Sequence, residues 1–435
     1  MKCRTPELLN MCRAPVTLVA LATLCVALVP AWARAGDDSL WSFGGHTKYQ
    51  YLHTRIPGDS VLHGNGADRL QDHNLDLRLK VSARRGRWGL DTHLQFIAMH
   101  SDTLAGSGSA LSPLFAAMGV INDERRWFDL THVFNNNGGN ASLLRLDRAS
   151  LAYTGNKTVL RFGRQAVSWG NGLLFTPMDI FNPFDPTAVD KEYKSGDDML
   201  YGQYLQDNGN DLQAVVVVRR DLTSGDLERD ASSIAVKYHG FRGGLEYDLL
   251  LSEHYSERVL GLGLSTDLAG AVWRGDLVWN DAQKGSEFSV VAGASYSGVL
   301  AGHNWSGFLE YFYNGFGQAD GAYSPAELAD NPDLLNRVAR GELYNLGRHY
   351  LGASVTLELT PLLTLTPNVF ANLEDPSALI QVVLSWDVRE NFLLTGALNV
   401  PLGPNGSEYG GIALDQQGAY LSYGASLFAQ LAWYY

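Results

Sequence analysis

Long runs in which apolar and polar side chains alternate recur along most of the chain. Residues 75–83, for example, place leucines and a valine on one face and Asp76, Arg78 and Lys80 on the other. A period of two is the signature of a β-strand with two different faces. The runs are about 10–13 residues long, which suits tilted strands that cross a bilayer, whereas strands of soluble sandwiches usually have about 5–6. The sequence therefore predicts an all-β transmembrane barrel with lipid outside and water inside.

Eighteen such runs can be counted. Two of them, 199–207 and 231–240, are weak, so sixteen strands is the alternative count. The prediction is an antiparallel up-and-down barrel of about 18 strands, and the runs lie near residues 41–55, 73–84, 87–99, 143–154, 157–168, 199–207, 211–220, 231–240, 242–253, 257–266, 270–280, 287–298, 302–313, 347–358, 362–373, 377–387, 391–400 and 419–435.

The connections between these runs alternate between short and long. An even strand count places both termini in the periplasm, with short periplasmic turns and long extracellular loops. Within the long connections, residues 111–120 form an apolar patch and residues 135–140 are predicted as plain loop. Ser324, Pro325 and Glu327 predict the start of a helix with a capping box. The long connections include 100–142, 169–198, 314–346 and 401–418.

The two ends of the chain carry export signals. Residues 1–35 combine basic residues, an apolar stretch at 16–29 and the small-x-small site Ala33-Arg34-Ala35, which predicts a signal peptide. The barrel is then predicted over residues 36–435. The last strand alternates and ends on Tyr435, which resembles the C-terminal strand that outer-membrane barrels present to the barrel-assembly machinery.

Composition excludes several classes of function. All three cysteines lie in residues 1–35, so the exported chain has no disulfide and no thiol chemistry. The formal charge is −13, and removal of a segment with four basic residues and one acidic residue makes it −16, which argues against nucleic acid as a partner. The 11 histidines are scattered, so we expect no enzyme activity, no cofactor and no metal. Calcium held by Asp179, Asp185 and Asp190 is the alternative for one loop.

The polar faces of the runs and the segment that follows residue 159 supply the candidate pore residues. Their mixed charges suit small polar or zwitterionic solutes; the competing interpretation is that they pair with one another and only hold the lumen in shape. The candidates are Arg78, Lys80, Asp91, His93, Arg145, Asp147, Arg161, Arg164, Gln165, Trp169, Arg274 and Asp276.

Residues 159–193 begin as a strand and continue as a long, aromatic, irregular segment. If Leu160 and Phe162 face lipid, Arg161 and Gln165 face the pore. Arg164 would then lie near the headgroups or at a bulge, because an arginine at the bilayer midplane costs about 2–4 kcal/mol. The irregular part is predicted either to narrow the lumen or to stand over it as a lid. Its candidate constriction residues are Asn171, Asp179, Asn182, Asp185 and Lys191.

The same stretch carries a family resemblance. The run Gly163-Arg164-Gln165, followed by Trp169-Gly170 and an Asn-Pro-x-Asp segment at 182–185, resembles proteobacterial outer-membrane porin-like barrels related to the alginate-export porins. The resemblance covers residues 144–192 and implies an outer-membrane channel whose arginine-rich strand lines the pore, with the following loop near its mouth. Alginate export would imply a strongly basic lumen, and the mixed charges here depart from that.

The prediction is a passive channel of the Gram-negative outer membrane for polar solutes or small organic molecules. Its expected partners are membrane lipid and lipopolysaccharide, the assembly machinery and a small-molecule or oligosaccharide solute, with the chain as a monomer or a trimer. The alternatives are a barrel that binds or anchors surface polysaccharide, and the barrel component of a periplasm-spanning complex.

Overall fold

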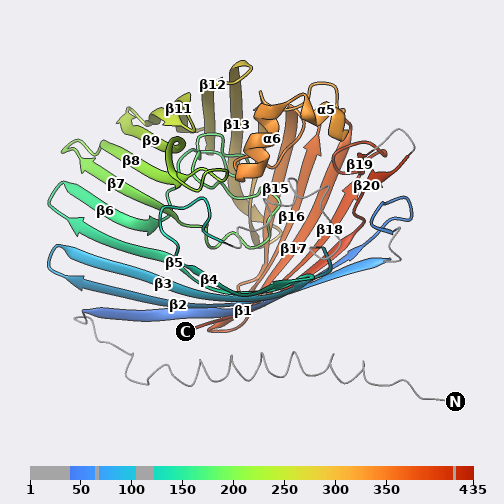
Figure 1. Cartoon of the computed structure of the whole chain (residues 1–435), viewed down its shortest axis with the longest axis horizontal. Helices are drawn as coiled ribbons and strands as arrows, with labels where there is room; N and C mark the ends of the chain where they lie inside the picture. The colour runs from blue at the N-terminus through green and yellow to red at the C-terminus, as the bar shows by residue number, and fades with distance from the viewer. Residues whose placement is uncertain (1–39, 64–67, 104–121, 415–417) are drawn as a thin grey trace.

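Eighteen long strands close into one antiparallel barrel in the computed structural model, which describes residues 40–63, 68–103, 122–414 and 418–435 (Figure 1). The predicted signal peptide (1–35) and the apolar patch at 111–120 lie outside the described residues. The barrel strands are β1 (Trp41–Arg55), β2 (Arg69–Arg85), β3 (Trp88–Ser101), β5 (Asn140–Thr154), β6 (Thr158–Gln165), β7 (Asp197–Leu205), β8 (Asp211–Arg220), β9 (Leu227–Arg242), β10 (Leu245–His254), β11 (Glu257–Leu268), β12 (Ala271–Ala282), β13 (Gly285–Leu300), β14 (His303–Asn314), β15 (His349–Thr360), β16 (Leu363–Asn372), β17 (Ser377–Arg389), β18 (Phe392–Leu402) and β21 (Ser426–Tyr434).

Every predicted run is a strand, including the two weak ones, which are β7 and β9. The predicted count of eighteen is therefore confirmed and the alternative of sixteen is wrong. Most boundaries differ from the prediction by a few residues, and two of these differences place residues outside the barrel strands. β6 ends at Gln165 rather than at residue 168, and β21 begins at Ser426 rather than at residue 419, because residues 420–421 form β20 (Tyr420–Leu421) against β19 (Ile412–Ala413).

The outer face of the barrel is apolar, as the alternation predicts. Leu79, Leu160 and Leu262 are 37%, 46% and 38% exposed, and in a membrane such side chains would face lipid. Trp273 and Trp386 are exposed near the ends of β12 and β17 that carry short turns, where an aromatic girdle is expected in a membrane barrel. Among the described residues no helix is both long and apolar enough to span a bilayer.

The long connections hold more structure than the sequence indicates. Residues 135–140 are not plain loop: β4 (Thr131–Asn137) and β5 form a hairpin that turns at Gly138 and Gly139, both with positive φ. The predicted helix is confirmed as two helices, α5 (Pro325–Ala329) and α6 (Pro332–Arg340), at one rim of the barrel (Figure 1). Ser324 and Glu327 form the capping box.

The last residue closes the barrel against the first strand. Backbone hydrogen bonds join Tyr435 and Gly45 in both directions, at 2.8 and 3.2 Å. The Tyr435 hydroxyl also donates to the carbonyls of His46 and Arg78, at 3.3 and 3.1 Å. Gly45 is required there, because a Cβ would lie 2.0 Å from the Arg78 carbonyl oxygen and 2.8 Å from the Tyr435 ring.

Deletion of Tyr435 should lower the amount of folded barrel in the membrane more than it alters the folded protein's activity. The deletion removes both backbone bonds and both hydroxyl bonds at the closing seam, each worth about 0.5–1.5 kcal/mol. The heat-modifiable folded band in membrane fractions measures the effect. Tyr435→Phe, which loses only the hydroxyl bonds, should give an intermediate level, and an unchanged level after deletion would contradict this account of the seam.

Candidate functional site

After β6 the chain leaves the wall and crosses the interior of the barrel. Residues 166–196, here called the strap, contain no helix or strand and return to the wall at β7. Figure 1 shows this segment as an irregular green trace inside the ring of strands. Of the two predicted alternatives, the strap is therefore a segment inside the barrel and not a lid standing over it.

One part of the strap is held by apolar packing. Its buried side chains form a hydrophobic core with inward-facing residues of β7–β12, so this part of the inner wall is apolar, unlike the uniformly polar inner face that the alternation suggests. The core explains why the strap is rich in aromatic residues. Its members are Val167, Trp169, Met178, Ile180 and Phe181 from the strap, and Met199, Tyr201, Val215, Val217, Ala235, Leu250, Val259 and Val278 from the wall.

Two buried carboxylates of the wall hold the strap's backbone. Asp276 on β12 accepts hydrogen bonds from the backbone and side-chain nitrogens of Asn171, both at 2.8 Å. Glu310 on β14 accepts the amide protons of residues 173–175. A carboxylate that receives several backbone N–H bonds fixes a segment that has no ladder of its own. Phe175 stacks on Phe312 of β14 at 4.9 Å and continues this contact.

The C-terminal part of the strap contacts basic residues of β1 and β2. Asp190 and Glu192 pair with the Lys48 ammonium at 2.6 and 2.7 Å. The Tyr193 ring lies 4.2 Å from the Arg78 guanidinium and 4.6 Å from the Lys80 ammonium, and its hydroxyl contacts Lys80. Such stacking is attractive because the ring face is electron-rich. We call residues 190–193 the latch.

The remaining candidate constriction residues are tied locally. Asp179 pairs with Lys194, and its burial raises the pKa of Asp179 to about 6 against the opposing effect of the lysine. Asn182 donates to the Ser195 carbonyl at 3.4 Å, and Lys191 donates to the Pro186 carbonyl at 2.8 Å.

Asp185 accepts bonds from the backbone and the hydroxyl of Thr187, both at 2.8 Å. Since Asp179, Asp185 and Asp190 have separate partners, they do not converge on a calcium site. Among the residues that the structure describes, no group of His, Cys, Asp or Glu is arranged to hold a metal.

The other candidate pore residues are distributed around the inner wall. Asp147 is a hub of β5, with Arg78 at 2.6 Å, Arg148 at 2.9 Å and Arg145 at 4.0 Å. Asp91 and His93 lie beside it on β3, 3.5 Å apart.

The other candidates contact residues of neighbouring strands or of the strap. Arg161 stacks on Tyr201 at 4.3 Å, and Arg274 donates to Ser295 at 2.7 Å. Trp169 and Gln165 are 4% and 3% exposed and are covered rather than open to the lumen.

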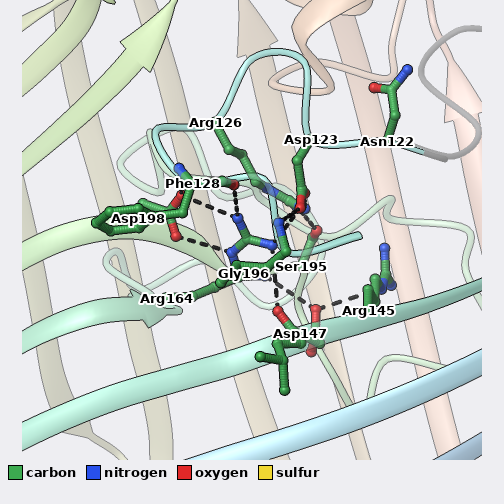
Figure 2. A network of polar contacts seen from close by, with 12 residues as sticks. Asn122, Asp123, Arg126, Phe128, Arg145, Asp147, Arg164, Ser195, Gly196 and Asp198 are labelled. Carbon is green, nitrogen blue, oxygen red and sulfur yellow. Dashed lines mark hydrogen bonds and ion pairs between the residues drawn. The ribbon is translucent and has the colours of Figure 1, made fainter. Parts of the chain in front are cut away.

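Arg164 is fully buried inside the wall and contacts neither lipid nor the lumen. Its guanidinium pairs with Asp198 of β7 at 2.9 Å and with Asp123 at 2.9 Å, and it donates to the carbonyls of Phe128 and Leu146 at 2.7 and 3.3 Å (Figure 2). Gly163, at φ +115, precedes it, where a Cβ would lie 2.1 Å from the Ala149 carbonyl. The sequence predicts that Arg164 lines the pore, or lies near the headgroups or at a bulge. Its register with β5 and β7 is regular, and two carboxylates and two carbonyls satisfy it within the protein instead.

Residues 122–137, here called the wall insert, surround this arginine. β6 and β7 are only 8 and 9 residues long, and above them the wall is completed by the insert. β4 of the insert pairs with β5, and the backbone of Arg126 forms an antiparallel β-bridge with that of Arg219 at the end of β8. Trp127 and Phe128 pack against the outward Phe162 ring at 6.0 and 6.2 Å, so the insert also covers the outer side of the Arg164 site.

Solved structures resemble this architecture over nearly its whole length. OccAB4 of Acinetobacter baumannii matches with a TM-score of 0.53 over 92% of this chain and 99% of its own, at 8% identity. A BenF-like porin from Pseudomonas fluorescens Pf-5 matches at 0.52 over 92% and 98%, at 10% identity. Pseudomonas aeruginosa OccK2 (OpdF) matches at 0.52 over 91% and 97%, at 11% identity. This chain has a porin fold. No family model and no curated protein matches the sequence.

At the rim of the barrel that carries the long connections, α6 is held against the inner wall. Arg337 pairs with Glu257 of β11, and Glu342 contacts His254 of β10 at 3.1 Å and Arg340 at 4.0 Å. Burial opposes ionisation of Glu342, but His254 and the two arginines outweigh it and lower the pKa of Glu342 to about 2. The ionised carboxylate therefore stabilises the folded rim.

Several site residues escaped the sequence interpretation. Lys48 and Glu310 sit at polar positions of alternating runs and could have been found by the same rule as Arg78. Asp198 shares its face with the lipid-facing Leu200, just as Arg164 shares its face with Phe162. Two opposite charges on apolar faces of neighbouring strands signal a buried pair. Nothing in the sequence indicates that Tyr193 returns to β2.

Arg164→Met should destabilise the barrel by about 3–5 kcal/mol, because it leaves Asp123 and Asp198 buried without a counter-charge. The unfolding temperature, measured as the temperature at which the heat-modifiable folded band is lost, should fall clearly. Arg161→Met, which removes an inward arginine stacked on one tyrosine, is the matched control and should have a smaller effect. Adding Asp123→Asn and Asp198→Asn to Arg164→Met should restore part of the loss. Equal effects of the two arginine variants would contradict the role of this cluster.

The stabilising effect of Glu342 should depend on pH. A carboxylate whose folded pKa is about 2, below the unfolded value of about 4.3, contributes stability that is complete above about pH 4.5 and is lost as the pH falls toward 2. Glu342→Gln should therefore lower the unfolding temperature at pH 7, and its difference from the parent should shrink at pH 3. A difference that stays constant across this range would count against the assignment.

Proposed function

We propose that this protein is a channel of the Gram-negative outer membrane through which small polar solutes pass passively, with the strap as its constriction. The observation that carries the proposal is the strap itself. It is tied to β12, β14, β1 and β2 across the lumen, inside a barrel that is otherwise wide enough for an aqueous path.

Cavities on both sides of the strap support a route past it. The outer one, of about 480 Å³, lies between Pro186 of the strap, Tyr344 after α6, Leu379 of β17 and Tyr409. The inner one, of about 310 Å³, lies below Leu173 and is lined by hydroxyl groups of β13–β15: Ser295, Ser297, Ser306, Ser354 and Thr356. These volumes are at the lower end of those that hold small organic molecules, about 300–1,000 Å³.

The charge distribution favours small anionic or zwitterionic solutes. On the inner face of β1–β5, the basic side chains Lys48, Arg78, Lys80, Arg145 and Arg148 outnumber the carboxylates Asp76, Asp91 and Asp147. The contacts of Lys48 with Asp190 and Glu192 of the latch support binding of a carboxylate there. The matching acidic groups of the other wall, Asp276 and Glu310, are occupied by the strap's amides. OccK2, whose fold is similar, has been determined in complex with glucuronate, a carboxylated sugar, which supports the same solute class.

Location and partners follow from the same proposal. The chain would lie in lipid and lipopolysaccharide, reach the membrane through the assembly machinery by its C-terminal strand, and work as a monomer or a trimer without enzymatic chemistry. We further propose that the chain is related to the alginate-export porins. Passage of a polymer such as alginate would require the strap to move. A polysaccharide-anchoring barrel and a periplasm-spanning partner are the competing functions.

Recordings in planar bilayers test the channel. Purified protein should give discrete conductance steps, and a salt gradient should show anion preference if the β1–β5 wall dominates the path. Absence of any steps from folded protein would overturn the channel. Cation preference would keep the channel but contradict the proposed solute class.

Shortening the strap within residues 171–192 should raise single-channel conductance, because it removes material from the narrowest part of the lumen. Tyr193→Ala should also raise conductance and shift selectivity further toward anions, since it uncovers Arg78 and Lys80. Tyr204→Ala, at an exposed position on the outer face, is the matched tyrosine control and should leave both unchanged. No change on shortening the strap would place the conduction path elsewhere.

A further inference from the structure

The outer face of β1–β3 carries a group of basic and histidine side chains above its apolar band. Leu75, Leu77 and Leu79 on β2 give this face its apolar character, and the same face continues toward the extracellular end into polar residues. We call this group the rim patch; it consists of Arg55 and His53 on β1, Arg69 and His73 on β2, and His100 on β3.

The two arginines of the rim patch face each other directly. Arg55 and Arg69 are register partners in the β1–β2 ladder, and both are exposed. Like charges directly opposite in an antiparallel pair are destabilising. Within the part of the chain that the structure describes, neither arginine has an ion pair with a carboxylate. The nearby acids serve other groups: Asp68 contacts His63 at 3.1 Å, and Asp102 lies 3.6 Å from His100.

Two other outward arginines at the same rim, Arg229 and Arg258, have carboxylates beside them. Arg229 pairs with Glu253 at 2.8 Å. Arg258 on β11 stands directly opposite Glu253 on one side and Asp281 on the other. These two arginines therefore have carboxylates of the protein close to them, whereas Arg55 and Arg69 on β1 and β2 do not form an ion pair with any described carboxylate. An anion from outside the chain would supply the missing charge.

The histidines of the rim patch lie beside tyrosines of β1. A hydrogen bond of 2.7 Å joins His73 Nδ1 and the Tyr49 hydroxyl, and the centre of the His73 ring lies 5.0 Å from that of Tyr51 and 6.3 Å from that of His100. Tyrosines of this kind mark the interface between the hydrocarbon core and the headgroups. The rim patch thus begins where the apolar band ends.

We propose that the rim patch binds the phosphorylated glucosamine headgroup of lipopolysaccharide, with Arg55 and Arg69 gripping one phosphate. Guanidinium groups bind phosphate through paired, charge-assisted hydrogen bonds, and a phosphate between these two arginines removes their mutual repulsion. The inference rests on the proposed outer-membrane location, since that membrane presents this lipid at the extracellular end of the barrel. It does not depend on conduction through the lumen.

Native mass spectrometry of the full barrel in detergent tests this site. Bisphosphorylated lipid A should remain bound to the parent protein, and enzymatically dephosphorylated lipid A should not. Arg55→Gln with Arg69→Gln should weaken binding about tenfold or more, as expected for the loss of charged hydrogen bonds. Arg229→Gln with Arg258→Gln, the matched pair at the other side of the rim, should retain parental binding.

Three outcomes would overturn the proposal. These are equal retention of the dephosphorylated lipid, equal losses from the two double variants, and displacement of lipid A by equimolar phosphatidylglycerol, which would assign the patch to phospholipid phosphate. The comparison of the two lipids on the parent protein decides the matter even if the double variant fails to fold. Conductance of the Arg55/Arg69 variant should match the parent, so loss of lipid binding and failure of the channel are separately observable.

Discussion

The buried charge cluster around Arg164 is the interaction on which the rest of the structure depends. A barrel wall in lipid cannot leave strand edges unpaired, yet β6 and β7 stop after 8 and 9 residues. The wall insert fills the space above them, and Arg164 joins it to both strands through Asp123 and Asp198 (Figure 2). Because the insert completes the wall, the chain after Gln165 is free to enter the lumen. A buried charge set of this kind is strongly destabilised by loss of one partner.

The strap then uses two different kinds of contact on the two halves of the barrel. Aromatic and aliphatic side chains hold it firmly against β7–β12, and buried carboxylates hold its backbone on β12 and β14. On β1 and β2 it rests on cations through Asp190, Glu192 and Tyr193, contacts that a solute carboxylate could also make. In the proposed channel, the apolar contacts would fix where the constriction lies, and the ionic contacts would set the charge preference of the path.

The architecture could be predicted from the sequence because each barrel strand needs apolar side chains on its outer face and mostly polar side chains on its inner face. This requirement produces a regular alternation over long runs. The eighteen strands, the even count and the capped helix at Ser324 all follow from local pattern. The site could be predicted only in part. Arg78, Asp147 and Asp276 are at polar positions and lie on the inner wall, but Arg164 is neutralised by residues 34 and 41 positions away, which no local rule reveals. The apolar inner wall of β7–β12 was missed for the same reason, since the strap that covers it comes from elsewhere in the chain.

The proposed channel requires that the strap borders the conducting path. The described residues contain no cysteine, so Thr187→Cys would place a single thiol on the strap, at the wall of the outer cavity. A bulky thiol reagent added during a single-channel recording should then cause a stepwise, reductant-reversible fall in conductance, while Leu160→Cys on the outer face should show none. Complete labelling of the Thr187→Cys channel with no change in conductance would contradict the account.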